Sequence, residues 1–202
     1  MEEQKWLKWC RALQGVSQTG LFYAKNPGEV ERYNTVKRVA AEMLSQSTSA
    51  TVEYIETTFD KNVGYATPQV TVRGVIFNNS KALLVKERKN KLWTLPGGYA
   101  EINDSPAQSV IREIKEETGY DVKANKLLAV YDSVYKQIFH RYNLFFSCEI
   151  IGGNMLTNDE IEEIAFFELD EIKELHTFPN IYKQIVRFYE LYLDACSLTD
   201  FY

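Results

Sequence analysis

Apolar and polar positions alternate with helical spacing through the first sixty residues, which contain almost no strand signal. In the first stretch, apolar residues recur every three or four positions, so we expect them to share one helical face. These residues are Trp6, Leu7, Trp9, Cys10, Leu13 and Val16. After the breaker Lys25-Asn26-Pro27-Gly28, a second helical pattern runs from about Glu29 to Ser45, and a third covers Val52 to Phe59. Three short helices bury little surface alone. The region is therefore either a cap on the main domain or, as we favour, a dimerisation module.

Beyond residue 60 the pattern changes to that of strands and two longer helices. Runs rich in β-branched and aromatic residues predict strands at 69–77, 82–85, 92–95, 126–131, 141–151 and 164–169. Helical patterns cover 106–118 and 180–193. This order predicts an α/β domain with a mixed sheet flanked by helices. We expect a helical domain at 1–60, a linker at 61–67 and the α/β domain at 68–202.

Composition narrows the class of protein. Hydrophobic residues make up 45% and charged residues 25%, which is ordinary for a globular chain and argues against wholesale disorder. No apolar run approaches the roughly 20 residues that span a bilayer, and the N-terminus lacks the pattern of a secretory signal. The three cysteines are far apart and form no C-x-x-C pair, which predicts buried thiols in a reducing compartment. We therefore expect a cytoplasmic protein without membrane association. The net charge of −5 makes duplex nucleic acid an unfavourable partner and suits a site that collects Mg²⁺.

The helix expected at 106–118 has strong signals at both ends. Ser105 is a natural N-cap, Pro106 suits the first helical position, and Gln108 completes a capping box. Gly119 can supply the left-handed residue that follows the last turn. These signals fix the helix register, which a site built on its side chains requires.

Three carboxylates of this helix are expected to lie together. At 100° of rotation per residue, Glu113, Glu116 and Glu117 share an arc of roughly 100° that adjoins the apolar arc of the helix. Carboxylates crowded in this way repel one another unless cations neutralise them, and Mg²⁺ is the fitting hard cation. The alternative is a surface helix whose acidic residues are offset by Arg112 and Lys115. We favour the metal site because the glycine loop and the caps accompany the carboxylates.

The segment from Gly97 to Tyr120 resembles the signature of the Nudix hydrolase family. That signature is a glycine, five residues, a glutamate, seven residues, and then R-E-U-x-E-E-x-G-U with U apolar. The matching residues are Gly98, Arg112, Glu113, Ile114, Glu116, Glu117 and Gly119. Two positions depart from it, because Asp104 replaces the first glutamate and Tyr120 the last aliphatic residue. The resemblance implies a Nudix α/β/α sandwich with a mixed sheet, here preceded by the small helical domain.

The resemblance also implies a metal-dependent mechanism. In the family, the carboxylates that match Glu113, Glu116 and Glu117, with the carbonyl that matches Gly98, hold Mg²⁺, for which Mn²⁺ is a possible substitute. Bound metal neutralises a diphosphate and lowers the pKa of a water that attacks phosphorus. The residue matching Arg112 orients a glutamate through charge-assisted hydrogen bonds. The catalytic set implied here thus begins with Arg112, Glu113 and Glu116.

The general base is a signature glutamate in some members and a glutamate of a later loop in others. The acidic run 159–163 supplies loop candidates, of which Glu163 is our first choice and Glu160 the second; a solvated acidic loop is the alternative. For substrate binding, Arg88 and Arg73 could reach a phosphate, although either could be an ordinary surface arginine. Trp93 could stack on a base or pack in the core.

The N-terminal stretch narrows the resemblance to one bacterial Nudix subgroup. Trp6 to Trp9, Ser17 to Leu21, Glu31 to Tyr33 and the linker Gly64 to Pro68 resemble the helical domain of enzymes that hydrolyse X-linked nucleoside diphosphates. This implies a homodimer through the helical domain and a substrate such as CDP-choline, cleaved to CMP and phosphocholine. ADP-ribose is the main alternative substrate.

Two further classes of function stay open. The chain could sense a nucleotide without cleaving it, although the complete set of three glutamates speaks against this. It could also act on RNA ends, guided by the basic residues Lys86, Arg88, Lys89 and Lys91, for which we favour a solvated turn instead.

Overall fold

The computed structural model describes residues 5–46, 48–132, 139–194 and 196–201. It divides into two compact units. The N-terminal unit contains the described residues up to Gln69 together with Phe139 and His140, and the second unit contains the described residues from Val70 to Asp132 and from Arg141 onward. No helix in these described ranges is both long and apolar enough to cross a membrane.

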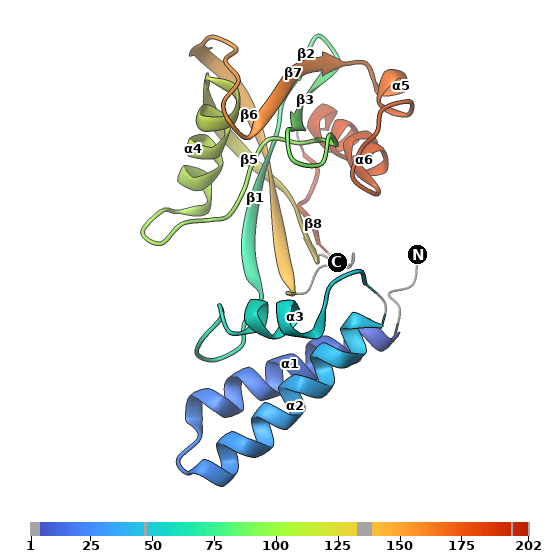
Figure 1. Cartoon of the computed structure of the whole chain (residues 1–202). Helices are drawn as coiled ribbons and strands as arrows, with labels where there is room; N and C mark the ends of the chain where they lie inside the picture. The colour runs from blue at the N-terminus through green and yellow to red at the C-terminus, as the bar shows by residue number, and fades with distance from the viewer. Residues whose placement is uncertain (1–4, 47, 133–138, 195, 202) are drawn as a thin grey trace. The chain divides into compact units, whose positions relative to one another are not determined.

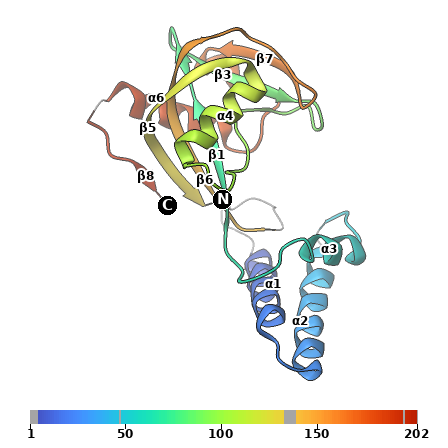
Figure 2. The same ribbon diagram turned by 90° about the vertical axis from the view of Figure 1, so that its left-hand side faces the viewer.

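The N-terminal unit consists of three helices, as predicted: α1 (Lys5–Tyr23), α2 (Pro27–Ser45) and α3 (Val52–Phe59). Helices α1 and α2 lie side by side (Figure 2). Helix α2 begins after Asn26, whose side chain accepts a hydrogen bond of 3.0 Å from the amide of Glu29. The core of the unit consists of Leu7, Cys10, Ala40, Ala41, Leu44, Ile55 and Phe59.

The apolar face predicted for the first helix is wrong in part. Leu7 and Cys10 are buried, but Trp9 and Val16 are each 57% exposed. The buried stripe of α1 continues instead through two polar residues, Gln14 and Ser17. The reason is helical geometry, because Trp9 and Val16 are seven positions apart and form a stripe of their own, offset from that of Leu7.

The second unit contains two sheets instead of the single sheet expected. One has the order β1-β6-β5-β8, where β5 is antiparallel to β6 and parallel to β8, so it is mixed as predicted. In the other sheet, β3 pairs antiparallel with β2, β4 and β7. The bounds are β1 (Gln69–Val75), β2 (Phe77–Asn78), β3 (Lys81–Glu87), β4 (Trp93–Thr94), β5 (Tyr120–Asp132), β6 (Arg141–Gly153), β7 (Ile161–Phe167) and β8 (Asp200–Phe201).

Helices cover the strands from opposite sides, which confirms the α/β/α arrangement (Figure 1). Helix α4 (Pro106–Thr118) packs on one side, and α6 (Ile181–Leu193) on the other, with the short α5 (Leu169–Ile172) near α6. Strand β3 shows how the layers form. Its Ala82 and Leu84 belong to the core under α6, while Leu83 and Val85 belong to the core under α4. A strand buried on both faces thus separates two apolar cores.

The cysteines follow the prediction for two of three positions. Cys10 and Cys148 are buried, whereas Cys196 is exposed, so the expectation of three buried thiols is wrong for Cys196. Burial raises the pKa of Cys148 to about 12, which keeps it protonated and inert.

Candidate active site

Helix α4 has the ends that its sequence predicts. The Ser105 hydroxyl accepts a hydrogen bond from the amide of Gln108 (3.2 Å), and the Gln108 side chain accepts one from the amide of Ser105 (2.9 Å), which completes the capping box. At the other end Gly119 has a φ of 77°, in the left-handed region. Both ends together fix which side chains face the core and which face the glycine loop.

The loop Gly97–Gly98 is fastened to strand β1. The amide of Val72 donates to the carbonyl of Gly98 (2.9 Å), and the guanidinium of Arg73 donates to the carbonyls of Gly97 (2.6 Å) and Leu95 (3.0 Å). Gly97 itself has a φ of 139° and lies against the β1 backbone. These contacts with β1 hold the loop in a position that faces α4.

The carboxylates of α4 meet this loop. The amide of Gly97 donates a hydrogen bond of 2.7 Å to the carboxylate of Glu117. The carboxylate of Glu113 lies against the Cα of Gly98, where a side chain would collide with it. Glu116 is the outermost of the three, with its side chain 55% exposed. The fold thus brings Glu113 and Glu117 against the Gly97–Gly98 loop, from which they are up to twenty positions apart in sequence, and leaves Glu116 at the outer side of the same helix.

Arg112 organises the acidic side of the helix. Its guanidinium donates to the carboxylates of Glu113 (2.9 Å), Glu116 (3.1 Å) and Asp104 (3.3 Å), and also to the carbonyl of Tyr99 (3.3 Å). A planar guanidinium with several donors suits this task, because it holds several acceptors in a defined geometry. Asp104, the departure from the family signature, is therefore engaged by the signature arginine.

Burial perturbs two of the carboxylates. It raises the pKa of Glu117 to about 7, against the opposing effect of the Gly97 amide. Burial also raises the pKa of Glu113, and the hydrogen bond from Arg112 opposes this in part. Burial therefore disfavours the ionised form of both carboxylates, and a bound cation would stabilise that form.

The donor set fits a hard divalent cation in its chemistry, although the carboxylates are turned to protein partners. Among the described residues, no three acidic, histidine or cysteine side chains form a cluster of metal-binding dimensions. The reason is that Arg112 bridges Glu113 and Glu116, while Glu117 accepts from Gly97. Carboxylate oxygens and a carbonyl oxygen with a second lone pair are the ligands that Mg²⁺ prefers.

The residues expected to bind substrate have other partners in the structure. Trp93 is only 6% exposed and packs edge-on against Phe167, with ring centroids 4.8 Å apart, which favours the core-packing alternative. Arg73 holds the glycine loop, as described above. The guanidinium of Arg88 donates to the backbone carbonyls of Asn158, Asp159 and Ile161. Neither arginine role was foreseen from sequence.

The acidic run before and within β7 divides into paired and unpaired carboxylates. Glu163 forms an ion pair with Lys86 (3.6 Å), opposite which it lies in the β3–β7 register, and Glu162 pairs with Lys91 (2.7 Å). In the described part of the chain, the Glu160 side chain has no hydrogen bond or ion pair. These two pairs also neutralise half of the basic cluster considered for guiding RNA, which weakens that alternative.

Asn158 is a residue that sequence reasoning missed. Its side chain contacts both the acidic run and α4, with a hydrogen bond of 2.8 Å to the carbonyl of Glu116. An asparagine just before a charged loop is a frequent turn-former, which is the only local signal that pointed to it.

Comparison with known proteins matches two family patterns to separate parts of the chain. The NUDIX domain pattern matches residues 67–189, and the pattern described as "UDP-X-like, N-terminal oligomerisation domain" matches residues 4–59. A Bacillus subtilis (strain 168) protein, "Putative ADP-ribose pyrophosphatase YjhB", is 36% identical over 187 residues, covering 91% of this chain and 90% of its own. A crystal structure of a UDP-X diphosphatase superposes with a TM-score of 0.62 at 28% identity, covering all of both chains. An ADP-ribose pyrophosphatase from Streptococcus suis superposes with a TM-score of 0.58 at 30% identity, covering 67% of this chain and all of its own.

Proposed function

This chain belongs to the Nudix family and is a Nudix pyrophosphohydrolase, and we propose that its substrate is a nucleoside diphosphate linked to a second group, with CDP-choline as first candidate. The observation that carries the proposal is that Glu113 and Glu117 meet the Gly97–Gly98 loop, while Arg112 joins Glu116 to Glu113 on the same helix. A diphosphate needs cations to neutralise it, and this arrangement supplies oxygen ligands for them.

We propose Mg²⁺ as the cation, with Mn²⁺ as a substitute. When bound, such an ion neutralises the diphosphate and lowers the pKa of a water molecule. The protein would hold it through Glu113, Glu116, Glu117 and the carbonyl of Gly98. Arg112 keeps Glu113 and Glu116 oriented while they are free of metal, since it donates to both. Positioning of this kind reduces the reorganisation that catalysis would otherwise require.

The attacking water must lose a proton, and two loop glutamates are candidates to accept it. Glu163, the first choice from sequence, is engaged by Lys86. Glu160 has no side-chain partner in the described ranges, which favours it more than the sequence did. Comparing Glu160→Gln with Glu163→Gln would decide between them, because only the base should lose turnover while substrate affinity is kept.

Substrate choice is tested by products. Purified protein is incubated in Mg²⁺ with CDP-choline, ADP-ribose, a UDP-linked sugar and a short RNA at equal concentration, with a chelator as control. Release of CMP and phosphocholine from CDP-choline at the highest kcat/KM supports the proposal. Preference for ADP-ribose, the substrate named for two relatives, would replace CDP-choline and keep the chemistry. Binding without turnover of any compound would favour a nucleotide sensor.

We also propose that the protein is a homodimer through its N-terminal unit. The oligomerisation description of the pattern matched at residues 4–59 supports this. So do the exposed apolar side chains of α1 and α2, among them Trp9, Val16, Phe22 and Tyr23.

A further inference from the structure

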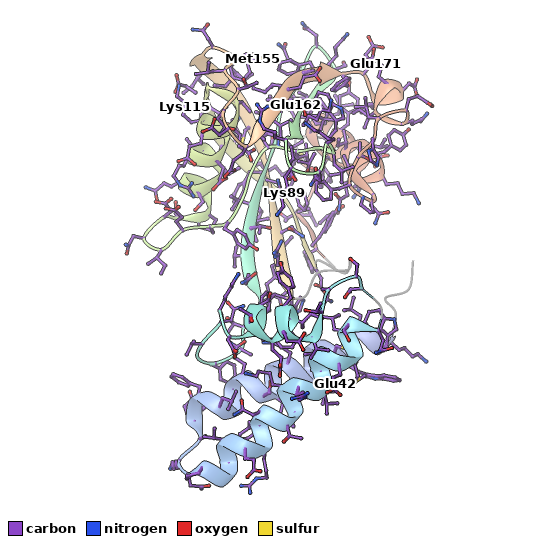
Figure 3. All side chains as sticks on the ribbon, viewed as in Figure 1. Glu42, Lys89, Lys115, Met155, Glu162 and Glu171 are labelled. Carbon is purple, nitrogen blue, oxygen red and sulfur yellow. The ribbon has the colours of Figure 1, made fainter. Side chains whose placement is uncertain are left out.

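The last turn of α4 is capped by a segment far away in the chain. Carbonyl groups at a helix C-terminus lack helical partners and must find others. Here the carbonyl of Thr118 accepts from the amide of Leu156 (2.9 Å), and the carbonyl of Glu116 accepts from the side chain of Asn158 (2.8 Å). Figure 3 shows Met155, on this segment, beside the end of α4 that carries Lys115. The connection between β6 and β7 therefore forms part of the end of the carboxylate-bearing helix.

Asn158 makes two kinds of contact with its one amide group. Its Oδ1 accepts from the amides of Glu160 (2.9 Å) and Ile161 (2.8 Å), while its Nδ2 donates to the carbonyl of Glu116. The two donors at Oδ1 fix the orientation of the amide, because a flipped group would oppose N–H to N–H. One side chain thus shapes the loop turn and ties that turn to α4.

Arg88 holds the same turn from the side of β3. Its amide donates to the carbonyl of Glu160 (2.8 Å), and its guanidinium donates to three other carbonyls of the turn. The backbone of Glu160 is therefore fixed at both its N–H, by Asn158, and its C=O, by Arg88. Its side chain remains free to act, whereas its position relative to Glu116 is set by the Asn158 amide.

We propose that Asn158 is a positioning residue that couples the acidic loop 158–163 to the metal-binding face of α4, so that a loop carboxylate and the α4 carboxylates act on the same substrate. The inference rests on the proposed function. The coupling passes through the Glu116 carbonyl, one residue from Glu117. We expect loss of this bond to leave each element folded and to loosen the placement of the loop on α4, since the bond from the Leu156 amide to the Thr118 carbonyl would then be the remaining hydrogen bond described above between the β6–β7 connection and α4.

Two substitutions separate the two contacts of Asn158. Asn158→Asp keeps acceptor oxygens for the turn but puts an oxygen in place of the donor to Glu116. Asn158→Ala removes both contacts. Asn154, an exposed asparagine of the same segment, gives matched controls, because Asn154→Asp adds the same charge and Asn154→Ala the same truncation.

We expect Asn158→Asp and Asn158→Ala each to lower kcat by about tenfold or more, with KM for the nucleotide within about twofold, because small misplacement of reacting groups costs rate steeply. The Asn154 variants should retain the wild-type kcat. Thermal unfolding checks that Asn158→Asp is folded. A kcat of Asn158→Asp equal to that of Asn154→Asp would overturn the proposal. So would a rise in KM, together with loss of the folded state, in both Asn158 variants, because the residue would then serve the fold in general.

A second readout is independent of turnover. The coupling predicts faster hydrogen–deuterium exchange of the α4 amides at 116–118 in Asn158→Asp than in Asn154→Asp, since the last turn loses a cap. If the wild-type protein hydrolyses none of the compounds above, the proposed function fails, and this exchange still tests the coupling. Equal exchange in the two variants would refute it.

Discussion

Gly97→Ala and Gly98→Ala should affect different properties of the protein. The first should lower its stability, and the second should lower its turnover. A Cβ on Gly97 would collide with the backbone carbonyl of Val72 and lie 2.9 Å from the Cα of Arg73. Strand β1 cannot yield, and the φ of 139° is itself unfavourable for alanine. Backbone strain of about 1–3 kcal/mol and overpacking of about 1–3 kcal/mol give a loss of roughly 2–6 kcal/mol in unfolding free energy. The melting temperature of this unit should fall by roughly 10 °C or more.

A Cβ on Gly98 would instead meet only the end of a flexible side chain. It would lie 2.8 Å from the carboxyl carbon of Glu113, whereas an ordinary carbon contact is about 3.5 Å or longer. The carboxylate can rotate away by about 1 Å, so unfolding free energy should change little. If Glu113 binds metal as proposed, displacing its carboxylate that far should lower kcat by about a hundredfold.

The assay is thermal unfolding followed by circular dichroism, together with steady-state hydrolysis of the preferred substrate. Gly152→Ala serves as a control for an added methyl group in the same unit, because a Cβ there would lie no closer than 3.6 Å to its neighbour Asp121. Gly98→Ala with wild-type turnover would refute the placement of Glu113. Gly97→Ala with an unchanged melting temperature would refute the role given to the contact between loop and strand.

Three further predictions concern single residues. Glu116→Gln should reduce turnover by several orders of magnitude with the circular dichroism spectrum unchanged, because the side chain is largely exposed; near-normal rates would contradict the metal assignment. Trp9→Ala should weaken self-association in sedimentation experiments at low concentration, while Lys8→Ala should not, and an unchanged dimer would count against the dimerisation proposal. Arg187 lowers the pKa of Asp200, so the pair stabilises the fold above the unfolded-state pKa of about 3.9, and this contribution disappears as pH falls further. Asp200→Asn should therefore lower the melting temperature at pH 7, and the difference from wild type should shrink as the pH falls through the lowered pKa of Asp200; a constant difference would refute the electrostatic origin.

Local signals allowed much of the fold to be predicted. The limits of α4 follow from Ser105 and Gly119, because capping is decided within a few residues. Strand β5 was predicted too short, since its first half contains residue types that are depleted in strands, namely Asp121, Lys123 and Asn125. Its pairing with β6, which no local signal contains, extends it to Tyr120. The two-residue β8 and the four-residue α5 were missed because they are too short for a periodic pattern.

In the candidate site too, features set by local sequence could be predicted, whereas those set by long-range contacts could not. Helical rotation alone grouped Glu113, Glu116 and Glu117 as a proposed metal site, and the structure adds the contact of Glu113 and Glu117 with the glycine loop. The hydrogen bonds from Arg88 to backbone carbonyls were not foreseen, because these carbonyls lie 70 to 73 positions later in the chain. Long-range contacts of this kind require the pairing of β3 with β7, which periodicity within either strand does not reveal.

The short strand β8 has a consequence for solubility. Strand β5 would be a bare edge of its sheet, and β8 pairs with it only at Ala129 and Val130. An uncovered strand edge offers amide and carbonyl groups to the edge of another molecule, which is a common route to aggregation. The ion pair of Arg187 with Asp200 holds the short strand β8 against this edge. Sequence changes that release β8 should therefore appear first as precipitation at high protein concentration, before any loss of the fold itself.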